Sequence, residues 1–152
     1  MRVADAMTRN TKVIQTSSDK VWDVLADGWL YPLWVVGATR MRGVERHWPE
    51  KGAKIHHSAG AWPLVVNDET EVLDCEPGRL LRLRAAGWPL GEAEVLITLE
   101  PVGSHTRVEL DEDASVGPGK LVPKFVRAPV IAWRNTETLL RLALLAEGRA
   151  AG

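Results

Sequence analysis

The sequence predicts an α+β fold in which an antiparallel β-sheet of about seven strands is closed by one long C-terminal helix. Three observations predict it. The 152 residues amount to about one domain, which we expect to span residues 1–152 with an ordered core at about 8–147. Between residues 38 and 114, short strand-like segments are separated by turns rich in Gly and Pro, and this spacing leaves no room for crossover helices. Residues 121–147 then carry apolar side chains at helical spacing.

The chain begins with a pattern for one strand followed by one or two short helices. Residues 9–16 alternate weakly and predict a strand. The Ser-Ser-Asp segment at 17–19 suits a helix N-cap, and apolar residues recur at helical spacing from there to Ala26. Because Pro32 interrupts regular structure, the apolar run at 29–34 predicts a turn or a second short helix.

The middle of the chain predicts six more strands, at residues 39–47, 53–59, 64–75, 79–86, 92–101 and 106–114. Alternation gives these strands one apolar and one polar face, since Leu81 and Leu83 lie opposite Arg82. The same alternation places Glu112 on the apolar face together with Leu110. We therefore expect a sheet with one face turned toward the core.

The last segment predicts a helix whose apolar face closes the core. Its three- and four-residue spacing joins Phe125, Val126, Pro129, Val130, Trp133, Thr136, Glu137, Leu140 and Leu144 on one face. Because an interior proline removes a backbone hydrogen bond, Pro129 predicts a kink or a break near Ala128, with the longer half at 129–147. Gly148 suits the C-terminal cap of this helix.

Composition limits the classes of partner. Nineteen Lys and Arg against 20 Asp and Glu give a formal charge of -1, which disfavours a nucleic-acid partner. A single cysteine, Cys75, excludes an internal disulfide and agrees with a reducing compartment. We find neither a signal peptide nor a membrane-spanning segment, and we expect a cytoplasmic protein that is compatible with a homodimer.

Three short sequences carry a family resemblance. They are Lys-Val-Trp-Asp-Val-Leu at 20–25, Thr-Glu-Val-Leu at 70–73 and Glu-Pro-Gly-Arg-Leu-Leu at 76–81. With the order of elements, they make the chain, from about residue 8 to 147, resemble the polyketide cyclase/dehydrase-like branch of the SRPBCC superfamily, which is related to START domains. The resemblance implies a helix-grip fold, a curved sheet around the C-terminal helix. It also implies an apolar cavity between them that in relatives holds lipids, sterols or aromatic polyketides. Relatives include enzymes, carriers and sensors, and they share no catalytic triad, so the fold does not decide the function.

His57 is the first candidate for proton transfer, because an imidazole titrates near neutral pH. Adjacent strand residues face opposite sides, and alternation with Ile55 and Ala59 favours His57 as the inward member of the pair, with His56 outside. A hydrogen-bonded interior histidine without catalytic function is the alternative. No second ligand lies at a metal-binding spacing and no phosphate-binding loop is present, so we expect neither a metal nor a cofactor.

Asp68 is the second candidate. Alternation sends Asp68 with Val66 and Glu69 with Val65, so one of the two carboxylates enters the interior. A buried carboxylate would have a raised pKa and could act as a general acid or base. Solvent-facing charge near a strand end is the alternative.

We predict a binding site for a small hydrophobic or aromatic molecule between the sheet and the last helix. Arg134 could contact a polar group of the ligand, or pair with Glu137 or the sheet rim. The predicted ligand-binding residues are Trp34, Trp62, Leu83, Val95, Ile97, Phe125, Trp133, Arg134 and Leu140. Two alternatives remain open: a polyketide cyclase or dehydratase that uses His57 or Asp68, and a non-catalytic interaction or stress-related module with a filled interior.

Overall fold

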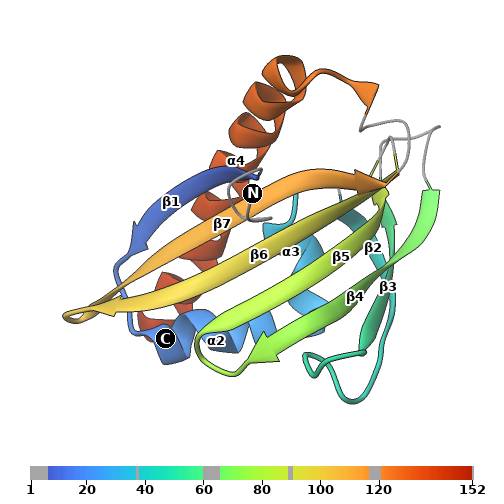
Figure 1. Cartoon of the computed structure of the whole chain (residues 1–152). Coiled ribbons are helices and arrows are strands. Elements are labelled where there is room, and N and C mark those ends of the chain that lie inside the picture. Colours follow the sequence, from blue (N-terminus) through green and yellow to red (C-terminus); the bar gives the residue numbers. More distant parts are fainter. Residues whose placement is uncertain (1–6, 37, 60–65, 89–90, 117–120, 152) are drawn as a thin grey trace.

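A computed structural model describes residues 7–36, 38–59, 66–88, 91–116 and 121–151 and has the predicted helix-grip architecture. Within these ranges, seven antiparallel strands form one curved sheet in the order β1-β7-β6-β5-β4-β3-β2 (Figure 1). The strands are β1 (Thr8–Ile14), β2 (Ala38–Val44), β3 (Lys54–Ala59), β4 (Val66–Glu76), β5 (Leu80–Trp88), β6 (Gly91–Val102) and β7 (His105–Val116). The helices are α2 (Ser18–Ala26), the 3₁₀ turn η1 (Gly28–Leu30), α3 (Tyr31–Trp34) and α4 (Lys124–Ala151).

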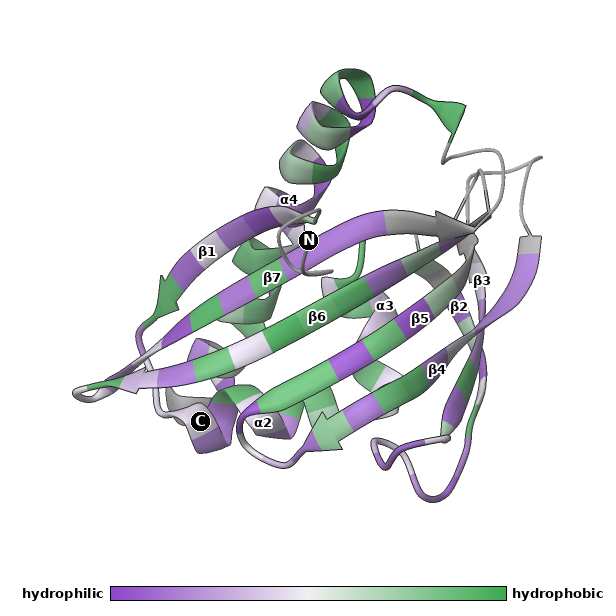
Figure 2. Ribbon diagram, in the orientation of Figure 1, coloured by the Kyte–Doolittle hydropathy of each residue, from purple (hydrophilic) through white to green (hydrophobic). Residues whose placement is uncertain are grey.

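Strand pairing places apolar residues of neighbouring strands side by side, so that one face of the sheet is continuously apolar. Leu81 on β5 lies opposite Ile97 on β6, which in turn lies opposite Leu110 on β7. These three side chains are fully or almost fully buried, and hydropathy alternates along the strands as predicted (Figure 2). The second short helix that the sequence predicts is also present, since the apolar run at 29–34 forms part of η1 and all of α3. The side chains of Tyr31 and Trp34 on α3 are buried in the core.

The helices cover the apolar face of the sheet, with α4 crossing it and packing on β1, β7, α2 and α3 (Figure 1). Asn10 on β1 ties the two ends of the chain together, since its side-chain amide donates to the Ala132 carbonyl oxygen (3.0 Å) and to the Thr136 hydroxyl (3.2 Å). No helix in the described ranges is long and apolar enough to cross a bilayer.

Three expectations about α4 are wrong. Of the kink or break predicted near Ala128, the break does not occur, because the helix runs unbroken through Pro129. Gly148 lies inside the helix, which continues to Ala151, and is therefore not its cap. The third error concerns orientation: the predicted inward face of α4 points outward, so Phe125, Trp133 and Leu140 are exposed. The face that packs on the core instead carries Ile131, Asn135, Thr138, Leu139, Leu142, Ala143 and Ala146.

The orientation error has a physical reason. α4 carries two stripes on opposite sides, and the exposed stripe has the larger apolar side chains. The buried stripe contains small and polar residues that fit closely against neighbouring elements; Thr138, for example, accepts a hydrogen bond from the Val36 main-chain N–H of the segment after α3 (3.4 Å). Hydropathy alone therefore selects the wrong side.

Candidate functional site

A buried polar group joins β3, β4 and α3 beneath α4. The Thr70 hydroxyl lies 2.8 Å from His57 Nε2 and 3.1 Å from the Tyr31 hydroxyl. The Tyr31 ring stacks on the His57 imidazole with 5.3 Å between ring centroids, and Trp34 meets Tyr31 edge to face at the same separation. All four residues are buried, and His57 is only 3% exposed. Together they form a fixed aromatic and hydrogen-bonding surface inside an apolar core.

Burial controls the protonation of this group. Desolvation raises the pKa of Tyr31 to about 12, so the phenol stays protonated at neutral pH. Desolvation likewise lowers the pKa of His57, which outweighs the opposing attraction of the Asp68 carboxylate. The imidazole is therefore neutral at neutral pH, with one nitrogen able to accept a proton.

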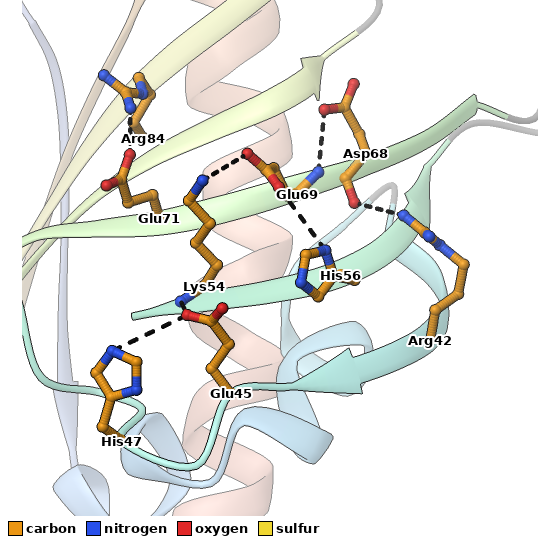
Figure 3. A network of polar contacts seen from close by, with 9 residues as sticks. All are labelled: Arg42, Glu45, His47, Lys54, His56, Asp68, Glu69, Glu71 and Arg84. Carbon is orange, nitrogen blue, oxygen red and sulfur yellow. Dashed lines mark hydrogen bonds and ion pairs between the residues drawn. The ribbon is translucent and has the colours of Figure 1, made fainter. Parts of the chain in front are cut away.

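The prediction that His57 faces inward and His56 outward is confirmed. His56 lies on the opposite face of the sheet, where its Nδ1 approaches the Glu69 carboxylate (3.7 Å) in a polar network with Lys54 (Figure 3). Asp68 is the direct register partner of His57, so alternation places it on the inner face while Glu69 is outside. Its carboxylate is half-buried and accepts from the Glu69 main-chain N–H (3.0 Å). The structure thus brings the two predicted proton-transfer residues together on one face.

A second polar element lies where α4 meets β7. Arg134 of α4 forms an ion pair with the carboxylate of Glu112, whose side chain is 5% exposed. Glu112 is on the inner face, as alternation predicts, between Val95 and Thr8 in the strand register. The two charges have opposite effects on Tyr31, since the Glu112 carboxylate raises the pKa of the phenol and the Arg134 guanidinium lowers it. Of the pairings considered for Arg134, the structure shows the one with the sheet, while Glu137 pairs with Arg141 (3.0 Å).

Two buried donors in this region have no hydrogen-bond partner among the described residues: Trp34 Nε1 and Asn135 Nδ2. An indole N–H can only donate, and buried donors in native proteins are almost always paired. Asn135 lies one helical turn before Thr138, on the side of α4 that contacts the segment after α3. The interior therefore offers donors suited to an acceptor oxygen.

The predicted ligand-binding residues fall into three groups in the structure. Trp34, Leu83, Val95 and Ile97 lie on the inner side, and Arg134 stands at its edge. Phe125, Trp133 and Leu140 lie on the outer face of α4 and do not line the interior. Trp62 lies outside the described residues.

Sequence reasoning missed Tyr31 and Thr70 as site residues. A signal for Thr70 was present, because a strand pairing that sets His57 opposite Asp68 also puts Thr70 on the same face, two residues further along β4. Tyr31 gave a weaker signal as the single tyrosine of the chain within an apolar run. Among the described residues, no three His, Cys, Asp or Glu side chains gather to hold a metal ion.

Comparison with known proteins gives the family. Residues 6–147 match the family model described as polyketide cyclase / dehydrase and lipid transport. The chain belongs to this family. The resemblance predicted from the sequence is thereby confirmed, and the family description covers both catalysis and carriage of a ligand. A search of curated proteins finds no match.

Solved structures share the fold of this family member at low identity. The protein NE0264 from Nitrosomonas europaea is 16% identical, with 96% of this chain and 97% of that chain covered and a TM-score of 0.71. The di-domain ARO/CYC StfQ from the steffimycin biosynthetic pathway is 14% identical over 96% of this chain, with a TM-score of 0.69. This chain covers 52% of StfQ, so it corresponds to about half of that protein. At these identities the likeness concerns the fold.

Proposed function

We propose that this protein binds a small, largely apolar molecule bearing an acceptor oxygen, held between the inner face of the sheet and α4. The observation that carries the proposal is the pair of buried donors, Trp34 Nε1 and Asn135 Nδ2, that no described protein group satisfies. Leaving a donor unpaired in the interior costs about 1–3 kcal/mol, and a ligand oxygen would remove that cost.

The hydrophobic core that contains Trp34 supports an apolar ligand. Leu83, Val95 and Ile97 supply aliphatic surface from β5 and β6, and Tyr31 and Trp34 supply flat ring surface. A pocket that is mostly apolar with a few fixed polar groups is typical of small-molecule sites. In this proposal Arg134, held at the interior edge by Glu112, contacts a second polar group of the ligand.

Native mass spectrometry of freshly purified protein tests the proposal first, because a co-purifying molecule names the ligand class. Trp34→Phe then tests the donor, since it keeps the ring and removes the N–H. We expect this variant to bind oxygen-bearing aromatic probes about tenfold more weakly than wild type, as one lost hydrogen bond predicts, with binding of the matched hydrocarbons unchanged. Trp29→Phe, at an exposed tryptophan, is the matched control and should bind as wild type does.

Two results would contradict the proposal. If no probe binds the wild-type protein, the remaining interpretation is an interaction module with a filled interior. If Trp34→Phe binds oxygenated and hydrocarbon probes as wild type does, the indole N–H does not contact the ligand.

A cyclase or dehydratase activity is the second candidate, and the neutral His57 beside Asp68 supports it. His57 Nδ1 is buried and has no hydrogen-bond partner within the distance and angle limits among the described residues, while the main chain of Ser58 raises the His57 pKa and so opposes the effect of burial. In this hypothesis Nδ1 accepts a proton from a substrate carbon next to a carbonyl group, and the Asp68 carboxylate stabilises the imidazolium that forms.

The catalytic hypothesis is tested with polyketone substrates. His57→Phe should abolish turnover and leave the substrate Kd within a few-fold of wild type, because the phenyl ring preserves the stack on Tyr31. Unchanged turnover in a His57→Ala, Asp68→Ala double variant would remove both residues from the proton-transfer assignment, while leaving ligand binding untouched.

A further inference from the structure

The outer face of α4 carries a regular apolar seam. Its members are Val126, Val130, Trp133, Glu137, Leu140 and Leu144, and they follow one another at spacings of four, three, four, three and four residues. This is the spacing of the a and d positions of a heptad repeat, which places side chains along one line of a helix that meets a partner helix. All members except Glu137 are apolar.

The seam faces solvent in the described structure. Trp133 is 75% exposed and Leu144 is 63% exposed, and the residues that pack on the core lie on the opposite side of the same helix. The first turns of α4 also extend past the edge strand β1 (Figure 1). The core formed by the described residues therefore does not use the seam, although the seam contains Trp133, the largest side chain of the helix.

We propose that this seam is the interface at which two copies of the chain form a dimer through antiparallel packing of their α4 helices. The exposed parts of the seam and of neighbouring Phe125 amount to about 500 Å² of apolar surface per copy, from typical side-chain areas. A patch of about 500 Å² is as large as the largest apolar patch that a typical monomer exposes, and such patches are often functional. Pairing two copies would bury about 1,000 Å² from these side chains alone, which reaches the lower limit for a specific interface.

The single charged member of the seam fixes the orientation. In a parallel pair, Glu137 would face Glu137 of the second copy, and two like charges would oppose each other. An antiparallel pair centred near residue 135 instead brings Val126 to Leu144, Val130 to Leu140 and Trp133 to Glu137. Arg141 of the same helix donates a hydrogen bond to the Glu137 carboxylate (3.0 Å). The negative charge of Glu137 is therefore already paired with a positive charge when the interface forms.

Sedimentation over a concentration series tests the dimer. Wild-type protein should sediment as a reversible dimer, and Trp133→Gln should raise the dimer Kd about 30-fold or more, the effect typical of a central tryptophan. Trp29→Gln removes an exposed tryptophan outside the seam and should dimerise as wild type does. Because Trp133 is exposed, circular dichroism should report an intact fold for both variants. A monomeric wild-type protein, or a Trp133→Gln variant that dimerises as tightly as wild type, would overturn the proposal.

Disulfide trapping tests the orientation in a Cys75→Ala background, which removes the one native thiol. The antiparallel arrangement predicts that a chain carrying both Val130→Cys and Leu140→Cys oxidises to a covalent dimer, because each new thiol approaches the other type on the second copy. The two positions are about 15 Å apart along one helix, so they cannot join within a chain. Each single variant should stay uncrosslinked. A covalent dimer from Val130→Cys alone would indicate parallel packing and overturn the antiparallel arrangement.

Discussion

His57 illustrates at the scale of one residue how burial sets chemistry in this protein. Its imidazole is stacked on Tyr31, bonded to Thr70 and almost fully buried, and desolvation lowers its pKa. In the unfolded chain the His57 imidazole takes up a proton at about pH 6.5, whereas in the folded chain its pKa is lower. Protonation of this residue thus favours unfolding as the pH falls.

The resulting prediction is that His57→Phe flattens the pH dependence of stability. Between about pH 7.5 and 5.5 the free energy of unfolding of the wild-type protein should fall, and the variant should lose less because it has no imidazole to charge. Urea unfolding at each pH measures the difference. His56→Phe, the same substitution at the neighbouring outward histidine, is the matched control. Parallel curves for wild type and His57→Phe would show that His57 titrates normally in the folded state.

The same residue shows what a sequence can and cannot predict about a site. Alternation along β3 was enough to orient His57 and His56, since a strand offers only two faces. The partners of His57 depend on strand register and on how α3 packs over the sheet. Tyr31 reaches Thr70 across 39 residues of sequence, and no local pattern encodes that distance.

At the scale of elements, α4 forms two ion pairs that differ in burial: Arg134 pairs with Glu112 of the sheet, whereas Arg141 pairs with Glu137 within the helix. We predict that Arg134→Gln destabilises the protein by about 3 kcal/mol, because it leaves the Glu112 carboxylate buried without its partner. Arg141→Gln removes an exposed pair with Glu137 on the same helix and should cost less than about 0.5 kcal/mol. Urea denaturation of the two variants gives the comparison. Equal, small losses would mean that Glu112 is hydrated in the folded state and that α4 does not depend on this pair.

The sequence predicts that a long helix exists at the position of α4, but it does not predict which face of the helix packs on the core. Helical spacing correctly gave a long helix after the last strand. The helix has an apolar stripe on each of two opposite sides, however. The side that faces the core packs closely through Ala143 and Ala146, and its Thr138 accepts a hydrogen bond from Val36. A hydropathy pattern contains no information about either contact. Helical spacing alone therefore predicts Trp133 and Leu140 as ligand-binding residues, whereas both are exposed in the structure and belong to the proposed dimer interface.

At the scale of the whole molecule, the antiparallel sheet followed from spacing, because strands separated only by short turns can pair in no other way. No local sequence pattern, however, predicts that the first and last elements of the chain pack together. β1 pairs with β7, and α4 packs on both β1 and α2. Near the C-terminus, the Glu147 carboxylate also accepts from the Gln15 main-chain N–H (3.0 Å). The first and last elements therefore complete one core together.

The joining of the two chain ends in one core predicts a sharp boundary for truncation within about the last three turns of α4. A chain ending after Glu147 should keep a cooperative fold, because the part of the removed segment that the structure describes makes a single exposed ion pair, Arg149 with Asp27, worth less than about 1 kcal/mol. A chain ending after Arg141 also loses Leu142, Ala143 and Ala146, which are buried against the core. Removing one buried leucine side chain costs about 2–5 kcal/mol, and a domain is stable by only about 5–15 kcal/mol, so the shorter chain should lose cooperative unfolding. Thermal unfolding followed by circular dichroism distinguishes the two. A cooperative transition in the shorter chain would mean that the sheet, α2 and α3 form a stable core without the end of α4.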